Sequence, residues 1–206
     1  YFPINEENPF LGWRGIRLTL DHPEIFLVQV RAMLRASIGL KNLRIMLPMI
    51  STVAEVQEAK RLVNQAYFEI CDEVCESGEV LQRPKLGIML EVPSVLYQLP
   101  QLAKHVDFFS VGSNDLTQYL LAVDRNNTRV AGLYNSYHPA VLAALYDIVQ
   151  QSNENQIPVT ICGEIAGEPA GAILLMGMGY RRLSMNAFNI RKINWLIRKV
   201  SLAESK

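Results

Sequence analysis

Hydrophobic positions along the chain follow two different periods. Short, nearly continuous apolar runs are typical of strands that are buried on both faces, as in a parallel sheet. Such runs predict strands at residues 43–50, 86–90, 106–111, 159–162 and 183–185. Apolar positions with helical spacing predict helices between them: two pieces between residues 12 and 38, divided near Pro23, one from Thr52 to Gly78, and others at residues 114–123, 139–155, 168–178 and 189–200.

Strands that alternate with helices predict an α/β fold with a parallel sheet, organised as a single domain over residues 1–206. Polar residues follow four successive strands: Glu91, Asn114 with Asp115, Glu164 after Cys162, and Asn186. In parallel barrels the functional residues lie at the carboxyl ends of the strands, whereas an open sheet gathers them at one crevice. The pattern favours a barrel. About five strand–helix units cannot close an eight-stranded barrel, so we expect an incomplete one.

Composition excludes several classes of protein. The 206 residues contain 20 Lys and Arg against 20 Asp and Glu, and 50% are hydrophobic, which excludes a disordered chain. The balanced charge argues against a nucleic-acid surface, and no apolar run is long enough to span a membrane. Three cysteines form no even disulfide framework and indicate a reducing compartment, by default the cytoplasm. The first residues lack the features of a signal peptide, and we expect them to come from the interior of a longer protein.

Two carboxylates and two arginines are candidates for binding chemistry. Glu91 and Asp115 lie just beyond two successive predicted strands, and one or two carboxylates suit Mg²⁺. The alternative is that Asn114 or Asp115 caps the next helix. Arg14 and Arg125 lie in polar segments, and their guanidinium groups suit phosphate or carboxylate oxygens. The alternative for each arginine is a solvated surface position.

Cys162 ends an apolar strand and precedes Gly163 and Glu164. A thiol at the mouth of a site can give or take a proton. The alternative is a small buried packing residue, which is common for free cysteine. The three histidines, His22, His105 and His138, show no pairing with a nucleophile.

Six segments together resemble the phosphoenolpyruvate-utilising enzymes, and within them Enzyme I of the bacterial phosphotransferase system. Their order and spacing fit from Asn8 to about Asn186. The nitrogen-related branch is the most similar, and the sugar-transport branch comes second. The segments are Asn8 to Arg14 (NPFLGWR), Arg44 to Met49 (RIMLPM), Gly87 to Pro93 (GIMLEVP), Asp107 to Tyr119 (DFFSVGSNDLTQY), Leu121 to Arg125 (LAVDR) and Cys162 to Glu164 (CGE).

The resemblance implies a (β/α)₈ TIM barrel that binds phosphoenolpyruvate and Mg²⁺ at its carboxyl-end mouth. By the family's order, this chain holds strands four to eight. The implied roles are metal ligation by Glu91 and Asp115, substrate binding by Arg14, Asn114, Asp115 and Arg125, and protonation of the enolate by Cys162. Ser113 stands where the family usually has Thr, and Val92 stands where Thr is common.

The resemblance also implies partners. The family passes the phosphoryl group to a histidine on an N-terminal domain and then to an HPr-like phosphocarrier protein, and its barrels pair as homodimers. None of the three histidines here lies in the Thr-Ser-His-like context of the acceptor. We therefore expect this chain alone to lack full phosphotransfer activity.

Two alternatives stay open on the sequence. One is the barrel of a pyruvate phosphate dikinase or phosphoenolpyruvate synthase, which would share the Cys-Gly-Glu segment. The other is a non-catalytic dimerisation or regulatory module. The presence of Glu91, Asn114, Asp115, Arg125 and Cys162 argues against an inactive site.

Overall fold

The computed structural model describes residues 5–75 and 78–201. Its first elements are α1 (Ile16–Asp21), α2 (Pro23–Ala36), β1 (Arg44–Leu47), α3 (Val53–Cys75), β2 (Lys85–Leu90), the 3₁₀ helix η1 (Pro93–Tyr97), α4 (Leu99–Leu102) and β3 (Phe108–Gly112). The remaining elements are α5 (Ser113–Leu121), the 3₁₀ helix η2 (Ala131–Leu133), α6 (Pro139–Glu154), β4 (Val159–Cys162), α7 (Glu164–Gly167), α8 (Pro169–Met178), β5 (Leu183–Ser184) and α9 (Ala187–Ile197).

The five predicted strands and the main predicted helices are confirmed. A local signal accounts for the start of α3. Glu55 accepts from the backbone N–H of Thr52 at 2.8 Å, and Thr52 Oγ1 accepts from the backbone N–H of Glu55 at 3.3 Å, which is a capping box. The last turn expected before Gly78 includes residues 76–77, which lie outside the described residues.

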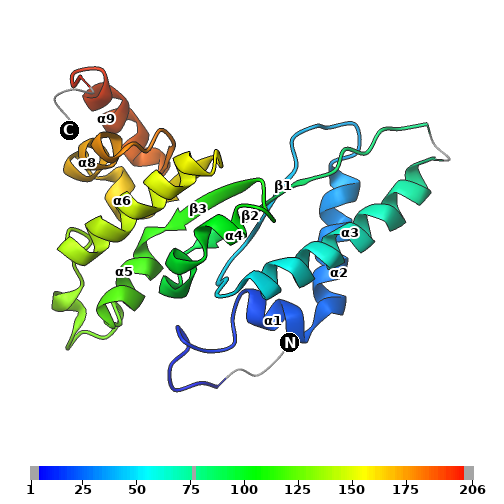
Figure 1. The fold of residues 1–206 in the computed structure, drawn as a ribbon, viewed down its shortest axis with the longest axis horizontal. Coiled ribbons are helices and arrows are strands. Elements are labelled where there is room, and N and C mark those ends of the chain that lie inside the picture. Colours follow the sequence, from blue (N-terminus) through cyan, green and yellow to red (C-terminus); the bar gives the residue numbers. More distant parts are fainter. Residues whose placement is uncertain (1–4, 76–77, 202–206) are drawn as a thin grey trace.

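The sheet is parallel throughout, with the spatial order β1-β2-β3-β4-β5. A doubly wound sheet reverses its strand order at a switch point, whereas consecutive strands of a (β/α)₈ barrel stay in sequence order. The observed order is that of consecutive barrel strands, as the sequence predicts. Figure 1 shows α2 and α3 beside β1 at one end of the sheet and α8 and α9 at the other end.

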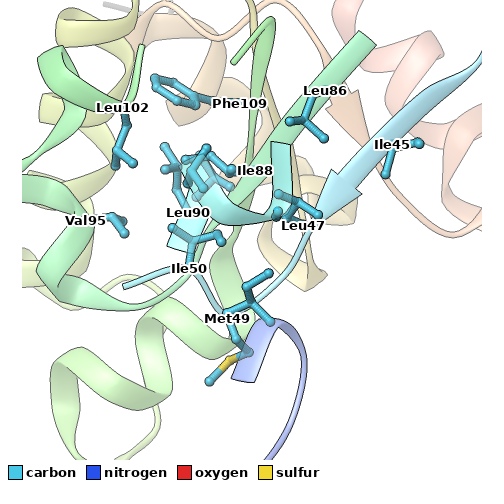
Figure 2. Packing of buried hydrophobic residues seen from close by; sticks show 14 of the residues in the cluster. Ile45, Leu47, Met49, Ile50, Leu86, Ile88, Leu90, Val95, Leu102 and Phe109 are labelled. Atoms are coloured by element: carbon cyan, nitrogen blue, oxygen red, sulfur yellow. The ribbon is translucent and has the colours of Figure 1, made fainter. Parts of the chain in front are cut away.

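One face of the sheet packs against the helices and forms the core. Side chains on that face of β1, β2 and β3 meet residues of η1 and α4 (Figure 2), where the buried residues include Ile45, Leu47, Leu86, Ile88, Leu90, Val95, Leu102 and Phe109. The burial of such apolar area is the main contribution to folding.

The prediction that the first strand is buried on both faces is wrong. Along β1, Ile45 and Leu47 are buried, while Arg44 and Met46 are exposed, and Met46 is 40% exposed. β1 is an edge strand, so Met46 has a neighbouring strand on one side only, where its partner in register is Gly87. Met46 lies on the face of the sheet that the remaining strands of a closed barrel would cover.

Parallel pairing brings the carboxyl ends of β2, β3 and β4 to one edge of the sheet. The N-terminal segment reaches the same edge, because the backbone N–H of Ile16 donates to the carbonyl of Pro48 at 3.2 Å. Gly15 has φ +58 there, and a Cβ would lie 2.9 Å from Cβ of Met49.

Within the described residues, none of the helices combines the length and the apolar character that crossing a membrane requires.

Candidate active site

Asp115 lies between two arginines that come from distant parts of the chain. Arg14 Nη2 is 3.3 Å from Oδ2 of Asp115, and Arg125 Nη2 is 3.3 Å from its Oδ1. The Asp115 side chain is 12% exposed, while each arginine keeps about a third of its side chain accessible, 37% for Arg14 and 32% for Arg125. Three predicted site residues therefore meet, with two partly exposed arginine side chains beside a sheltered carboxylate.

The loop that carries Arg14 is held by contacts of its own. The Arg17 guanidinium donates to the carbonyl of Leu11 at 2.6 Å, and the Arg14 guanidinium carbon lies 5.6 Å from the centre of the Phe10 ring. The Tyr119 hydroxyl donates to the carbonyl of Phe10, which ties this loop to α5. These contacts direct Arg14 toward Asp115.

Arg125 reaches Asp115 because the chain turns back after α5. Ala122 ends the helix in the left-handed region, with φ +53. The side-chain oxygen of Gln118 then accepts the backbone N–H of Arg125 at 3.2 Å, and Gln118 is only 4% exposed. Sequence reasoning missed Gln118 as a residue of the site. Its one signal was its place in the family segment that also contains Asp115.

Glu91 is buried beside these groups and is 3% exposed. Its Oε1 accepts the backbone N–H of Met49 at 2.6 Å, and Met49 adopts φ +60, a rare conformation for a residue other than glycine. Burial raises the pKa of Glu91 above its ordinary value, and the nearby Asp115 carboxylate raises it further, while the Met49 N–H and the Arg14 charge lower it. The two carboxyl groups thus lie close together in a sheltered place, where two negative charges would repel each other.

This arrangement fits Mg²⁺. Oδ1 of Asp115 is buried and accepts no hydrogen bond, although it lies near Arg125. A divalent cation would supply the missing partner and relieve the repulsion between Glu91 and Asp115. Residues 5–75 and 78–201 contain no cluster of three or more His, Cys, Asp or Glu side chains able to hold a metal. Two neighbouring carboxyl groups, Glu91 and Asp115, suit an ion that takes its other ligands from substrate and water, as Mg²⁺ does.

Cys162 lies at the end of β4 with its thiol partly buried. Its Sγ donates to the carbonyl of Val111 at 3.2 Å. Burial raises the pKa of this thiol, contact with Ser110 lowers it, and the charge of Glu91 raises it. The thiol therefore stays protonated at neutral pH, which suits a proton donor.

Asn114 connects the Cys162 turn to α5. Its side-chain oxygen accepts the backbone N–H of Glu164 at 3.1 Å, and its own carbonyl accepts from the Tyr134 hydroxyl at 3.3 Å. Asn114 therefore does not use its side-chain oxygen to cap α5. The structure thus gathers all six predicted site residues at the carboxyl edge of the sheet, namely Arg14, Glu91, Asn114, Asp115, Arg125 and Cys162.

Comparison with known proteins identifies the family of the chain. The sequence pattern of the family described as "PEP-utilising enzyme, PEP-binding domain" matches residues 1–202. The chain belongs to this family. Its fold also resembles a citrate lyase from Burkholderia xenovorans LB400, with a TM-score of 0.61 and 20% identity over 82% of this chain and 53% of that one. This likeness concerns the fold alone.

The curated relatives of this PEP-binding domain are larger proteins. It is 54% identical to "Phosphoenolpyruvate-dependent phosphotransferase system" of Escherichia coli K12, over 100% of this chain and 27% of that protein. It is 43% identical to "Phosphoenolpyruvate-protein phosphotransferase" of Haemophilus influenzae, over 98% of this chain and 34% of that protein. A "Multiphosphoryl transfer protein" of Rhodobacter capsulatus is 42% identical over 98% of this chain and 23% of its own length. The chain therefore spans about a quarter to a third of these relatives.

Proposed function

We propose that this chain is the phosphoenolpyruvate-binding catalytic part of a phosphoenolpyruvate-protein phosphotransferase. The observation that carries the proposal is Asp115 held between Arg14 and Arg125 beside the buried Glu91. Such a site offers arginine guanidinium groups for a phosphate and carboxylates for a cation at the same point. A phosphorylated substrate that binds with Mg²⁺ requires both.

Each residue then has a defined task. Arg14 and Arg125 bind oxygens of the phosphate, and Asn114 helps to orient the substrate. Mg²⁺ bound through Glu91 and Asp115 would neutralise negative charge on the transferring group and on the enolate. When the phosphoryl group has left, the S–H bond of Cys162 breaks and a C–H bond forms at the methylene carbon. Pyruvate and a thiolate result, and water returns a proton to the thiolate.

The wider reaction follows from the family. The phosphoryl group goes to a histidine on an N-terminal domain of the same protein and then to an HPr-like phosphocarrier protein. The names of the relatives support this over the dikinase and synthase alternatives. We further propose membership of the nitrogen-related branch, assembly as a homodimer and a cytoplasmic location, the last supported by the free thiols of Cys71, Cys75 and Cys162.

Calorimetric titration of phosphoenolpyruvate into the complete protein that carries this chain, with Mg²⁺ present, tests the proposal. Asp115→Asn is expected to weaken binding by at least about 100-fold, because a metal ligand and the partner of two arginines are lost together. Asp147→Asn, at an exposed position on α6, is the matched control and should bind like the wild type. Absence of Mg²⁺-dependent binding by the wild type would refute the proposed function.

A further inference from the structure

Ser113 begins α5 directly after Gly112, the last residue of β3, and it is 1% exposed. Its hydroxyl donates to the carbonyl oxygen of Cys162 at 2.7 Å. This is not a helix cap, in which a side-chain oxygen accepts a backbone N–H of the first turn. Ser113 instead ties the start of α5 to the end of the neighbouring strand β4.

A second hydrogen bond holds the other side of the same turn. The side-chain oxygen of Asn114 accepts the backbone N–H of Glu164, so the two bonds flank Gly163. Gly163 has φ +118, and a Cβ at this position would lie 2.1 Å from the Ser113 hydroxyl oxygen. The hydroxyl therefore takes the space that a side chain at residue 163 would need. The peptide after Cys162 is held from both sides.

These bonds matter for the thiol because Sγ is joined to the backbone through Cβ alone. The carbonyl and the thiol of Cys162 both make their contacts with the end of β3 and the start of α5, through Ser113 and Val111. Gly112 lies opposite Cys162 in the register of the sheet, so the two strand ends are adjacent. The direction of the thiol thus depends on the backbone that Ser113 holds, together with the Val111 carbonyl that accepts its hydrogen bond.

We propose that Ser113 is a positioning residue for proton transfer from Cys162, a role that rests on the function proposed above. Without the hydroxyl, the carbonyl of Cys162 loses its partner, and the turn is held only from the Asn114 side. The thiol then no longer points at the methylene carbon. The enolate takes its proton from water instead, and water reaches both faces of the planar carbon.

The stereochemistry of protonation tests this proposal in the complete protein. Phosphoenolpyruvate with one deuterium at a defined methylene position is converted in tritiated water with Mg²⁺, and the chirality of the pyruvate methyl group is measured. The wild type should give one configuration. Ser113→Ala should give a largely racemic methyl group and form pyruvate about tenfold more slowly. Ser113→Thr keeps the hydroxyl and should restore both properties.

Control variants distinguish a positioning role of Ser113 from a loss of folding. Ser152→Ala removes another buried hydroxyl, which donates to the carbonyl of Ile148 at 2.6 Å far from the site, and it should keep full chirality. Cys162→Ala should give pyruvate with a racemic methyl group. The affinity of Ser113→Ala for phosphoenolpyruvate should stay within about twofold of the wild type. If Ser113→Ala folds poorly, Ser113→Cys keeps the size of the side chain with a weaker donor and should still lose selectivity.

Two outcomes would overturn the inference in distinguishable ways. If Ser113→Ala gives a methyl group of a single configuration at the wild-type rate, Ser113 is not a positioning residue, and the proposed function is unaffected. A racemic methyl group from the wild type would remove the role of Cys162 as the proton donor, and the role of Ser113 with it.

Discussion

The guanidinium of Arg125 lies 3.3 Å from Oδ1 of Asp115, although Asp115 is in the first turn of α5 and Arg125 lies beyond its last residue. The chain must therefore run back along the helix to bring the two groups together. Gln118, in the middle of α5, holds the returning segment through the backbone N–H of Arg125. The arginine that we propose binds the phosphate is thus placed by a residue that need not touch the substrate.

Replacing Gln118 tests this placement. Gln118→Met keeps the length of the side chain and removes the acceptor for the Arg125 N–H, so binding of phosphoenolpyruvate should weaken about tenfold. Gln118→Glu keeps an acceptor and should bind more tightly than the Met variant. Gln150→Met, on α6, is the control, because the Gln150 side chain donates to the carbonyl of Met178 and not to the Arg125 segment. Calorimetry on the complete protein measures the affinities, and wild-type affinity in Gln118→Met would contradict the argument.

The buried Glu91 should make stability depend on pH. Its pKa in the folded protein is raised, chiefly by burial and in part by Asp115, so the folded state holds this proton more tightly than the unfolded state does. The resulting stabilisation is complete below the ordinary pKa of glutamate and is lost as pH rises through the raised value. Urea unfolding between about pH 4 and about pH 8 should show this loss in the wild type.

Glu91→Gln removes the titrating group and should flatten that part of the profile. Glu154→Gln, at an exposed position on α6, should leave the profile unchanged. Wherever Glu91 still holds this proton, the proton must leave before a cation can bind through it, so addition of Mg²⁺ should release protons in an unbuffered titration at the acid end of this pH range. Identical profiles for Glu91→Gln and the wild type would contradict the assignment.

Gly163 should tolerate alanine poorly. The substitution would place a Cβ at φ +118 and 2.1 Å from the Ser113 hydroxyl oxygen, so it should cost at least about 2 kcal/mol of unfolding free energy. Gly132→Ala is the matched control, because no atom lies within 4 Å of its added Cβ, and its effect should stay below about 0.5 kcal/mol. Chemical denaturation of both variants measures the difference, and equal losses would refute the close contact.

The open edge at β1 should make the isolated 206-residue chain associate with itself. An exposed edge strand offers unpaired backbone groups, and Met46 adds an apolar side chain that is 40% exposed. Met46→Lys should reduce the association seen by sedimentation, whereas Val28→Lys, at an exposed position of α2, should have less effect. A monomeric wild-type chain that melts cooperatively at high temperature would contradict this prediction.

The sequence by itself determined the order of strands and helices and the edge at which the site lies. Apolar runs and helical periodicity are local signals, and parallel pairing brings residues at or just beyond strand ends, such as Glu91, Asp115 and Cys162, to the same edge. Arg14 and Arg125 were candidates from their polar segments, but only the family resemblance separated them from ordinary surface arginines.

Only the tertiary structure decided how these groups meet. The contact of Arg14 with Asp115 depends on a loop held by Tyr119, and the hydrogen bond of Ser113 to Cys162 joins two strand ends that are distant in sequence. The exposure of Met46 likewise follows from the position of β1 at the edge of an open sheet. Such contacts depend on packing between segments far apart in the chain, and no local pattern of residues encodes them.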